Sequence, residues 1–183
     1  MGRLAGGAYD GDMASIGHVA VGMAAGRATG GARGEMALLT ALSLLPDVDV
    51  VAFRLGIPYH APFGHRGASH SLVFALGVGM LMALWLRRWG WRFSRAWLVA
   101  AAVVASHPVL DAMTDGGLGV ALLWPFSTER FFAPWRPLPV APIGARLMSE
   151  RGLRVMMIEL LQFMPLFVYA LWPRPQREHQ EPT

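Results

Sequence analysis

The chain has 183 residues, of which 54% are hydrophobic and 15% are charged. A soluble domain is typically about a quarter charged, so this chain has too little charge to cover a water-exposed surface, and we expect lipid to be the solvent for much of it. The net charge of +4 is small and spread along the chain, which argues against a nucleic-acid partner. Because cysteine is absent, any transition metal must be held by imidazole and carboxylate groups.

Five apolar segments follow one another along the chain. They cover Val19–Ala28, Met36–Leu45, Ser71–Leu86, Ala96–Leu110 and Val155–Trp172. A helix needs about 20 apolar residues to cross a bilayer; the last segment reaches the lower limit and the third comes close. Because apolar runs dominate and charge-rich amphipathic helices are missing, we expect an all-α integral membrane bundle of about four spans. Buried helices of a soluble protein are the alternative.

We expect a single domain over residues 1–183, with residues 1–12 an extension before a candidate start at Met13 and residues 173–183 a polar tail. The stretch Pro125–Arg154 holds closely spaced prolines, which rule out a long regular helix. It is expected to form a long loop outside the membrane, either a functional lid or an irregular connector.

Charged residues fall into two groups at the ends of the apolar segments. If the segments alternate in direction, one side collects Arg27, Arg33, Arg87, Arg88, Arg92, Arg95, Arg174 and Arg177. The tendency of arginine-rich loops to stay inside makes that side cytoplasmic. The same alternation gathers the candidate metal ligands on the opposite, outward side; they are His18, Asp47, Asp49, His65, His70, His107 and Asp111.

Three short motifs supply most of these ligands. The first is His65-Arg66-Gly67-Ala68-Ser69-His70-Ser71. Its two imidazoles can converge if His65 lies in a turn, which Gly67 allows, and His70 lies at a helix start. Two loop histidines with separate hydrogen bonds are the alternative.

The other two motifs lie where apolar segments end. The second is Pro46-Asp47-Val48-Asp49, whose carboxylates are costly near lipid unless a cation compensates them; a solvated turn is the alternative. In the third, His107 and Asp111 lie four apart on one helix face and can share an ion, or the Asp can orient the imidazole. A buried His–Asp hydrogen bond supporting a kink at Pro108 is the alternative.

Read in order, these motifs and His18 resemble the YdjM-like family of bacterial and archaeal inner-membrane proteins, which are thought to be metal-dependent hydrolases. The resemblance covers about His18 to Phe126, and Ser69 stands where the family form H-R-G-x-T-H-S has Thr. The family is distantly similar to zinc-dependent phospholipase C. That similarity implies an all-helical fold with a His/Asp multi-zinc site that cleaves phosphoesters.

We therefore expect a membrane-bound metal-dependent hydrolase that cleaves a phosphoester of a lipid or lipid-linked substrate in the bacterial or archaeal inner membrane, with membrane lipids as partners. One to three divalent ions, with zinc expected, would be bound, and a metal-bound hydroxide would attack the ester. A metal-binding or metal-transporting membrane protein without hydrolysis is the alternative. A structural membrane protein with His–Asp networks and no metal also stays open.

Three residues are candidates for catalytic roles. Arg66 could bind the substrate phosphate, or it could form a salt bridge to Asp47, Asp49 or Glu159. The general base could be Asp111 or Asp115, and the sequence does not choose between them.

Overall fold

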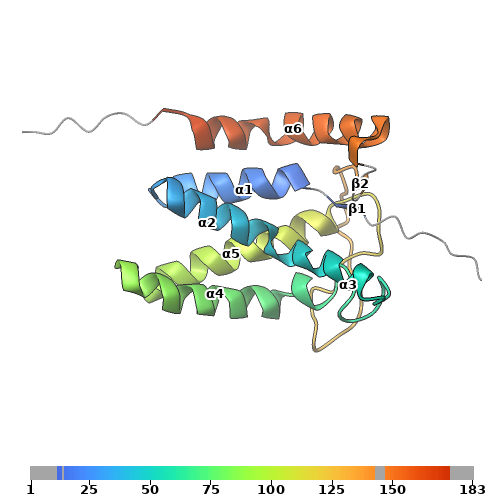
Figure 1. The fold of residues 1–183 in the computed structure, drawn as a ribbon, viewed down its shortest axis with the longest axis horizontal. Coiled ribbons are helices and arrows are strands. Elements are labelled where there is room, and N and C mark those ends of the chain that lie inside the picture. The colour runs from blue at the N-terminus through green and yellow to red at the C-terminus, as the bar shows by residue number, and fades with distance from the viewer. Residues whose placement is uncertain (1–11, 14, 143–146, 174–183) are drawn as a thin grey trace, which may run out of the picture.

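The computed structural model describes residues 12–13, 15–142 and 147–173. They form a bundle of helices that run roughly along one axis (Figure 1). The helices are α1 (Ser15–Ala28), α2 (Arg33–Leu44), α3 (Val51–Arg54), α4 (Leu72–Leu86), α5 (Phe93–Ala112) and α6 (Glu150–Leu171), with 3-10 turns η1 (Leu45–Val50), η2 (Ala68–His70) and η3 (Arg87–Trp89). Two-residue strands, β1 (Asp12–Met13) and β2 (Ala141–Pro142), pair antiparallel. The predicted all-α class is confirmed.

Four helical stretches are long and apolar enough to cross a membrane. They are Arg33–Arg54, which joins α2, η1 and α3, then Leu72–Trp89, Phe93–Ala112 and Glu150–Leu171. Helix α1 has 14 residues, or about 21 Å at 1.5 Å per residue, which is shorter than the hydrocarbon core of a bilayer. The predicted number of spans is confirmed, and the first apolar segment is a short helix beside them.

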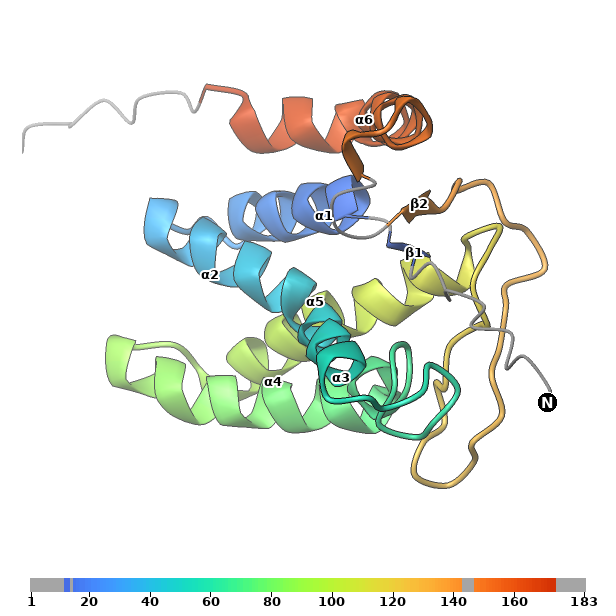
Figure 2. The same cartoon turned by 45° about the vertical axis from the view of Figure 1, so that its right-hand side comes forward.

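The helices pack as two antiparallel hairpins with one outer helix. Helices α4 and α5 form one hairpin, α1 and α2 form the other, and α6 lies against α1 (Figures 1 and 2). Leu39 and Leu42 of α2 pack with Val103 and Val104 of α5 in the core. Large apolar side chains point away from it on α4 and α6, as lipid contact requires; Leu81 is 63% exposed.

Three boundaries differ from the sequence prediction. Helix α6 begins at Glu150, ahead of the predicted segment, because the Ser149 hydroxyl accepts a hydrogen bond from the Gly152 amide and caps the first turn. Helix α5 continues across Pro108 to Ala112. Asp12, which belongs to the predicted extension, pairs with Pro142. Residues 1–11 of that extension and residues 174–183 of the predicted tail lie outside the described residues.

The two ends of the bundle are formed by different connecting segments. One end holds the α1–α2 turn and the α4–α5 turn; the other holds η1, α3, η2 and the loop after α5 (Figure 1). The described arginines divide between these ends. Arg27, Arg33, Arg87, Arg88, Arg92 and Arg95 lie at the first, and Arg54, Arg66, Arg130, Arg136, Arg151 and Arg154 at the second. Arg174 and Arg177 of the prediction lie outside the described residues.

Candidate metal centre

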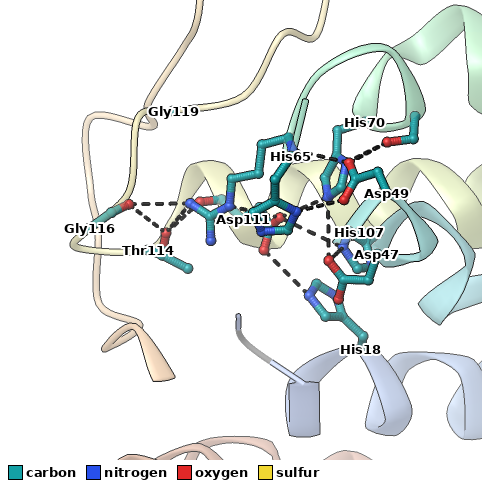
Figure 3. Close-up of polar contacts among 12 residues, drawn as sticks. His18, Asp47, Asp49, His65, His70, His107, Asp111, Thr114, Gly116 and Gly119 are labelled. Carbon is teal, nitrogen blue, oxygen red and sulfur yellow. Dashed lines mark hydrogen bonds and ion pairs between the residues drawn. The ribbon is translucent and has the colours of Figure 1, made fainter. Parts of the chain in front are cut away.

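His18 and the His and Asp residues of the three motifs meet at the second end of the bundle, although they come from four separate parts of the chain (Figure 3). His18 lies in the first turn of α1, and His107 and Asp111 lie in the last turns of α5. All four of the imidazoles concerned are completely buried: they belong to His18, His65, His70 and His107. Burial of so many titratable groups is costly unless they are paired or bind a cation.

Local sequence explains how the loop ligands reach this point. Pro46 has no N–H and lies in the first turn of η1, which carries Asp47 to the end of the bundle. Gly67 lies where an added Cβ would collide with the carbonyl of Pro62, so the loop can close tightly only with glycine there. His70 ends η2, directly before Ser71, whose hydroxyl accepts from the Phe74 amide and caps α4.

Asp47, His70, His107 and Asp111 form a completely or almost completely buried set of possible ligands, which we call the inner group. The Nε2 atom of His70 lies 3.2 Å from Asp111 Oδ2 and 3.6 Å from Asp47 Oδ1, and Nε2 of His107 lies 3.3 Å from Asp47 Oδ1 and 3.6 Å from Asp111 Oδ2. Around a tetrahedral zinc, neighbouring donor atoms lie about 3.3–3.6 Å apart. The inner group therefore has the spacing of a metal-ligand set.

Several donor atoms of this set have no hydrogen-bond partner among the described residues. They are Nε2 of His70 and His107, Oδ2 of Asp111, and both carboxylate oxygens of Asp47. Buried polar atoms are nearly always satisfied in folded proteins. Orphaned lone pairs that converge within one coordination sphere are the pattern that a bound cation explains, so the residues present fit a divalent metal.

The contacts of the Nδ1 atoms of His70 and His107 determine which ring nitrogen faces the centre, by which we mean the space between the four residues of the inner group. Nδ1 of His107 lies 2.7 Å from the Ser43 carbonyl oxygen, and an imidazole must donate its proton there. Nδ1 of His70 lies 3.0 Å from Asp49 Oδ2. Each histidine then carries its proton on Nδ1 and offers the Nε2 lone pair, as metal-binding histidines commonly do.

Asp49 lies outside the inner group, and both of its carboxylate oxygens contact neighbouring donor groups. Its carboxylate lies 2.6 Å from His65 Nδ1 and accepts hydrogen bonds from the Arg66 amide, at 3.1 Å, and from the Ser69 hydroxyl. Asp49, His65 and His70 also lie close enough to form a second ligand set. A neutral imidazole has one lone pair, however, so His70 cannot serve both sets at once.

His18 adjoins the inner group through Asp111. Its Nε2 lies 3.5 Å from Asp111 Oδ1, and its ring stacks on that of His107 at 3.6 Å between centroids. Burial, followed by the neighbouring His107, lowers the pKa of His18. For His70, burial lowers the pKa, but the nearby carboxylates of Asp111, Asp47 and Asp49 outweigh it and raise the pKa well above its ordinary value.

The two other predicted catalytic residues are placed differently from each other. Arg66 is completely buried, and its Nε lies 3.2 Å from Asp111 Oδ2, a partner that the sequence interpretation did not name. Its backbone φ of 58° is left-handed and strained for a non-glycine residue, which is common at functional sites. Asp115 is exposed and accepts a hydrogen bond from the Val140 amide, so the structure does not bring it into the cluster.

Two further residues near the site, Glu159 and Arg130, have contacts that the sequence did not predict. Glu159 of α6 is buried and accepts a hydrogen bond from the Ile16 amide at 3.0 Å, which caps the start of α1 just before His18. Its position inside an apolar segment was the signal. Arg130 ties the loop after α5 to the motif loop, and nothing in the sequence marked it. Its guanidinium donates to the carbonyl oxygens of Tyr59, Ala61, His65, Arg66 and Gly119.

Comparison with known proteins gives two matches. Residues 13–176 match the model of a family described as YdjM inner membrane protein. The chain is also 45% identical, over 139 residues, to the inner membrane protein YbcI of Escherichia coli (strain K12), an alignment that covers 73% of this chain and 80% of that relative. No solved structure matches the chain. Both descriptions refer to the inner membrane, and neither mentions a metal or a reaction.

Proposed function

Because this chain belongs to the YdjM inner membrane protein family and spans the bacterial inner membrane more than once, we propose that it is a membrane-bound metal-dependent hydrolase. Its substrate would be a phosphoester of a lipid or lipid-linked molecule, and membrane lipids would be its partners. The whole chain would act as one domain. The reaction class is favoured by the ligand chemistry, and the lipid substrate by the position of the cluster at one end of the spans.

The observation that carries the proposal is the inner group, with its convergent lone pairs lacking hydrogen-bond partners among the described residues. A donor set of imidazole and carboxylate suits zinc, which binds histidine nitrogen and carboxylate oxygen in four-coordinate sites. With His70, His107 and the two inner carboxylates as ligands, the site would hold one ion. When bound, that ion would act as a Lewis acid, and it would supply a nucleophile near neutral pH if water takes a further coordination position beside the four protein ligands.

Neighbouring residues of the chain would orient the ligands and compensate the negative charge of the site. The Ser43 carbonyl and Asp49 hold the imidazoles of His107 and His70 so that both Nε2 atoms face the centre. Arg66 would fix the Asp111 carboxylate by its ion pair and lower the negative charge that a phosphoester meets. Burial lowers the pKa of His18, which favours its neutral form, and its Nε2 would accept a proton beside Asp111.

We further propose that the site faces outward. Support comes from the arginines of the two short turns at the opposite end, where Arg95 donates a hydrogen bond to the Thr29 carbonyl and so joins the turns. The longer loop at the site end carries exposed arginines as well, among them Arg136. Direct labelling of each end therefore decides the sidedness.

The proposal is tested on protein purified in detergent without chelator. Bound metal is quantified by elemental analysis, and turnover is measured on phospholipids, lipid phosphates and a soluble phosphodiester. We expect about one zinc per chain and hydrolysis of at least one of these substrates. Substituting a ligand in His70→Ala or Asp111→Ala should remove both the metal and the turnover. Asp115→Ala is the matched control, because this carboxylate is exposed and bound to the Val140 amide.

Metal binding without hydrolysis is the second candidate, and complete burial of His70 and His107 is the observation that favours it. A catalytic ion needs an open position for substrate, whereas a structural ion does not. Metal that is lost in Asp111→Ala, in a protein that hydrolyses none of the substrates, would establish this candidate. A protein that contains no metal would end both.

A further inference from the structure

A groove of about 340 Å³ opens beside the inner group. Its walls include the side chains of Phe63, Val73, Phe74 and Trp124, and the rings of Phe63 and Trp124 meet edge to face at 5.6 Å between centroids. This volume lies in the range of small-molecule sites, which are concave and mostly apolar. The groove is thus concave and mostly apolar.

The inner end of the groove is formed by the residues that hold His70. Asp49 and Ser69 both line it. Asp49 Oδ2 lies 3.0 Å from Nδ1 of His70, and the Ser69 hydroxyl lies 3.0 Å from the same nitrogen. One imidazole ring therefore separates the end of the groove from the Nε2 atom that faces the centre.

The outer end of the groove opens on the membrane-facing side of α4. Val73 stands in the first turn of this helix and is 40% exposed, and Phe63 is 64% exposed. Leu76, Met80 and Leu84 continue the exposed apolar face along a candidate span. The groove therefore adjoins an exposed apolar face of a candidate span.

We propose that this groove binds one hydrocarbon chain of a membrane lipid. Asp49 is the one charged residue among those lining the groove, and four hydrogen-bond donors compensate its carboxylate. The walls therefore suit an apolar ligand and reject an ionic one. The inference rests on the proposed function for the identity of the head group, whereas binding of the chain stands by itself.

A chain-length series tests the groove by binding rather than by turnover. Dibutanoyl and dihexanoyl phosphatidic acid differ by two CH₂ groups per chain. Burying one CH₂ is worth a factor of about four in affinity, so one buried chain should make the longer lipid bind about sixteenfold more tightly. Val73→Trp, which fills the groove, should abolish most of this gain. Leu81→Trp is the matched control, because Leu81 is exposed two turns further along α4 and does not line the groove.

All three proteins are measured in the same detergent, so that partition of the lipids into micelles cancels. A second measurement needs no substitution. Phosphatidic acid with a photoreactive diazirine at the chain end is irradiated with wild-type protein in lipid nanodiscs, and adducts are mapped by mass spectrometry. We expect adducts on Phe63, Phe74 or Trp124.

Several outcomes would overturn the inference. Equal gains in Val73→Trp and Leu81→Trp would do so, as would adducts scattered along the exposed face of α4. An altered oligomeric state of Val73→Trp with unchanged lipid affinity would make the groove a contact between copies of the chain. A chain-length gain in a protein that hydrolyses no phosphoester would uphold the groove and end the hydrolase proposal.

Discussion

Asp49→Asn separates the two ways in which the His/Asp cluster can hold metal. If the inner group holds a single ion, Asp49 orients His70 from behind and supplies no ligand. If the second set is also a site, Asp49 is itself a ligand, together with His65. The substitution preserves the shape of the side chain while it removes the charge, so the two arrangements give different metal contents.

The magnitude follows from the contacts of Asp49. Its oxygens face Nδ1 of His65 at 2.6 Å and Nδ1 of His70 at 3.0 Å, and asparagine weakens both contacts because charge-assisted hydrogen bonds are about twice as strong as neutral ones. Only the His70 contact touches a ligand of the inner group, and a hydrogen bond to a charged group is worth about 1.5 kcal/mol, so the loss is about tenfold in zinc affinity. Carboxylates behind metal-binding histidines typically contribute about 10–100-fold.

The assay is zinc titration in competition with a chromophoric chelator, together with elemental analysis. Asp49→Asn should bind one zinc per chain about tenfold more weakly than wild type, whereas Asp47→Asn, which loses a ligand, should contain no stoichiometric zinc. The reasoning is refuted if Asp49→Asn loses exactly one of two ions and keeps the affinity of the other. Wild-type affinity in Asp49→Asn would refute it equally.

Three further predictions follow from the same contacts. The pKa of His70 is raised in the metal-free protein, so its cation stabilises the fold fully below the unfolded-state pKa, and this stability is lost as pH rises through the folded pKa. Zinc binds only the neutral ring, so calorimetry in buffers of different ionisation enthalpy should show that protons are released when zinc binds. If no protons are released, the placement of His70 among the ligands is wrong. Arg130→Ala should lower the free energy of unfolding by about 3 kcal/mol, since five carbonyl oxygens lose their charged donor, and an unchanged melting temperature would argue against this clamp. The chain has no cysteine, so a single introduced cysteine can be labelled selectively. Thr128→Cys at the site end should react with a membrane-impermeant maleimide on intact cells, whereas Ser94→Cys at the other end should react only after lysis. The reverse pattern would place the site inside.

The location of the candidate site followed from sequence because it depends on topology alone. His70 precedes an apolar segment and His107 lies near the end of the next, so alternating helices carry both to one end of a bundle. The number of spans followed in the same way from the length of the apolar runs. Such inferences need no knowledge of side-chain contacts.

The contacts and roles of the individual residues within the cluster could not be predicted from the sequence. Asp47 and Asp49 are two residues apart and chemically identical. Only the conformation of the turn η1 brings Asp47 into the inner group and directs Asp49 toward Nδ1 of His70. The partner of Arg66 depends on its left-handed backbone, which no motif announces. Asp115 follows Asp111 by one helical turn in sequence, but α5 has already ended at Ala112 and turned its carboxylate toward Val140.

The central claim is that the inner group binds a metal ion, and anomalous X-ray scattering from crystals grown with zinc tests it most directly. An anomalous difference map recorded at the zinc edge should show one peak between Nε2 of His70 and His107 and the carboxylates of Asp47 and Asp111, about 2.0–2.2 Å from each donor atom. A map of well-ordered, zinc-supplemented protein with no peak there, or with its peak elsewhere in the chain, would contradict the account.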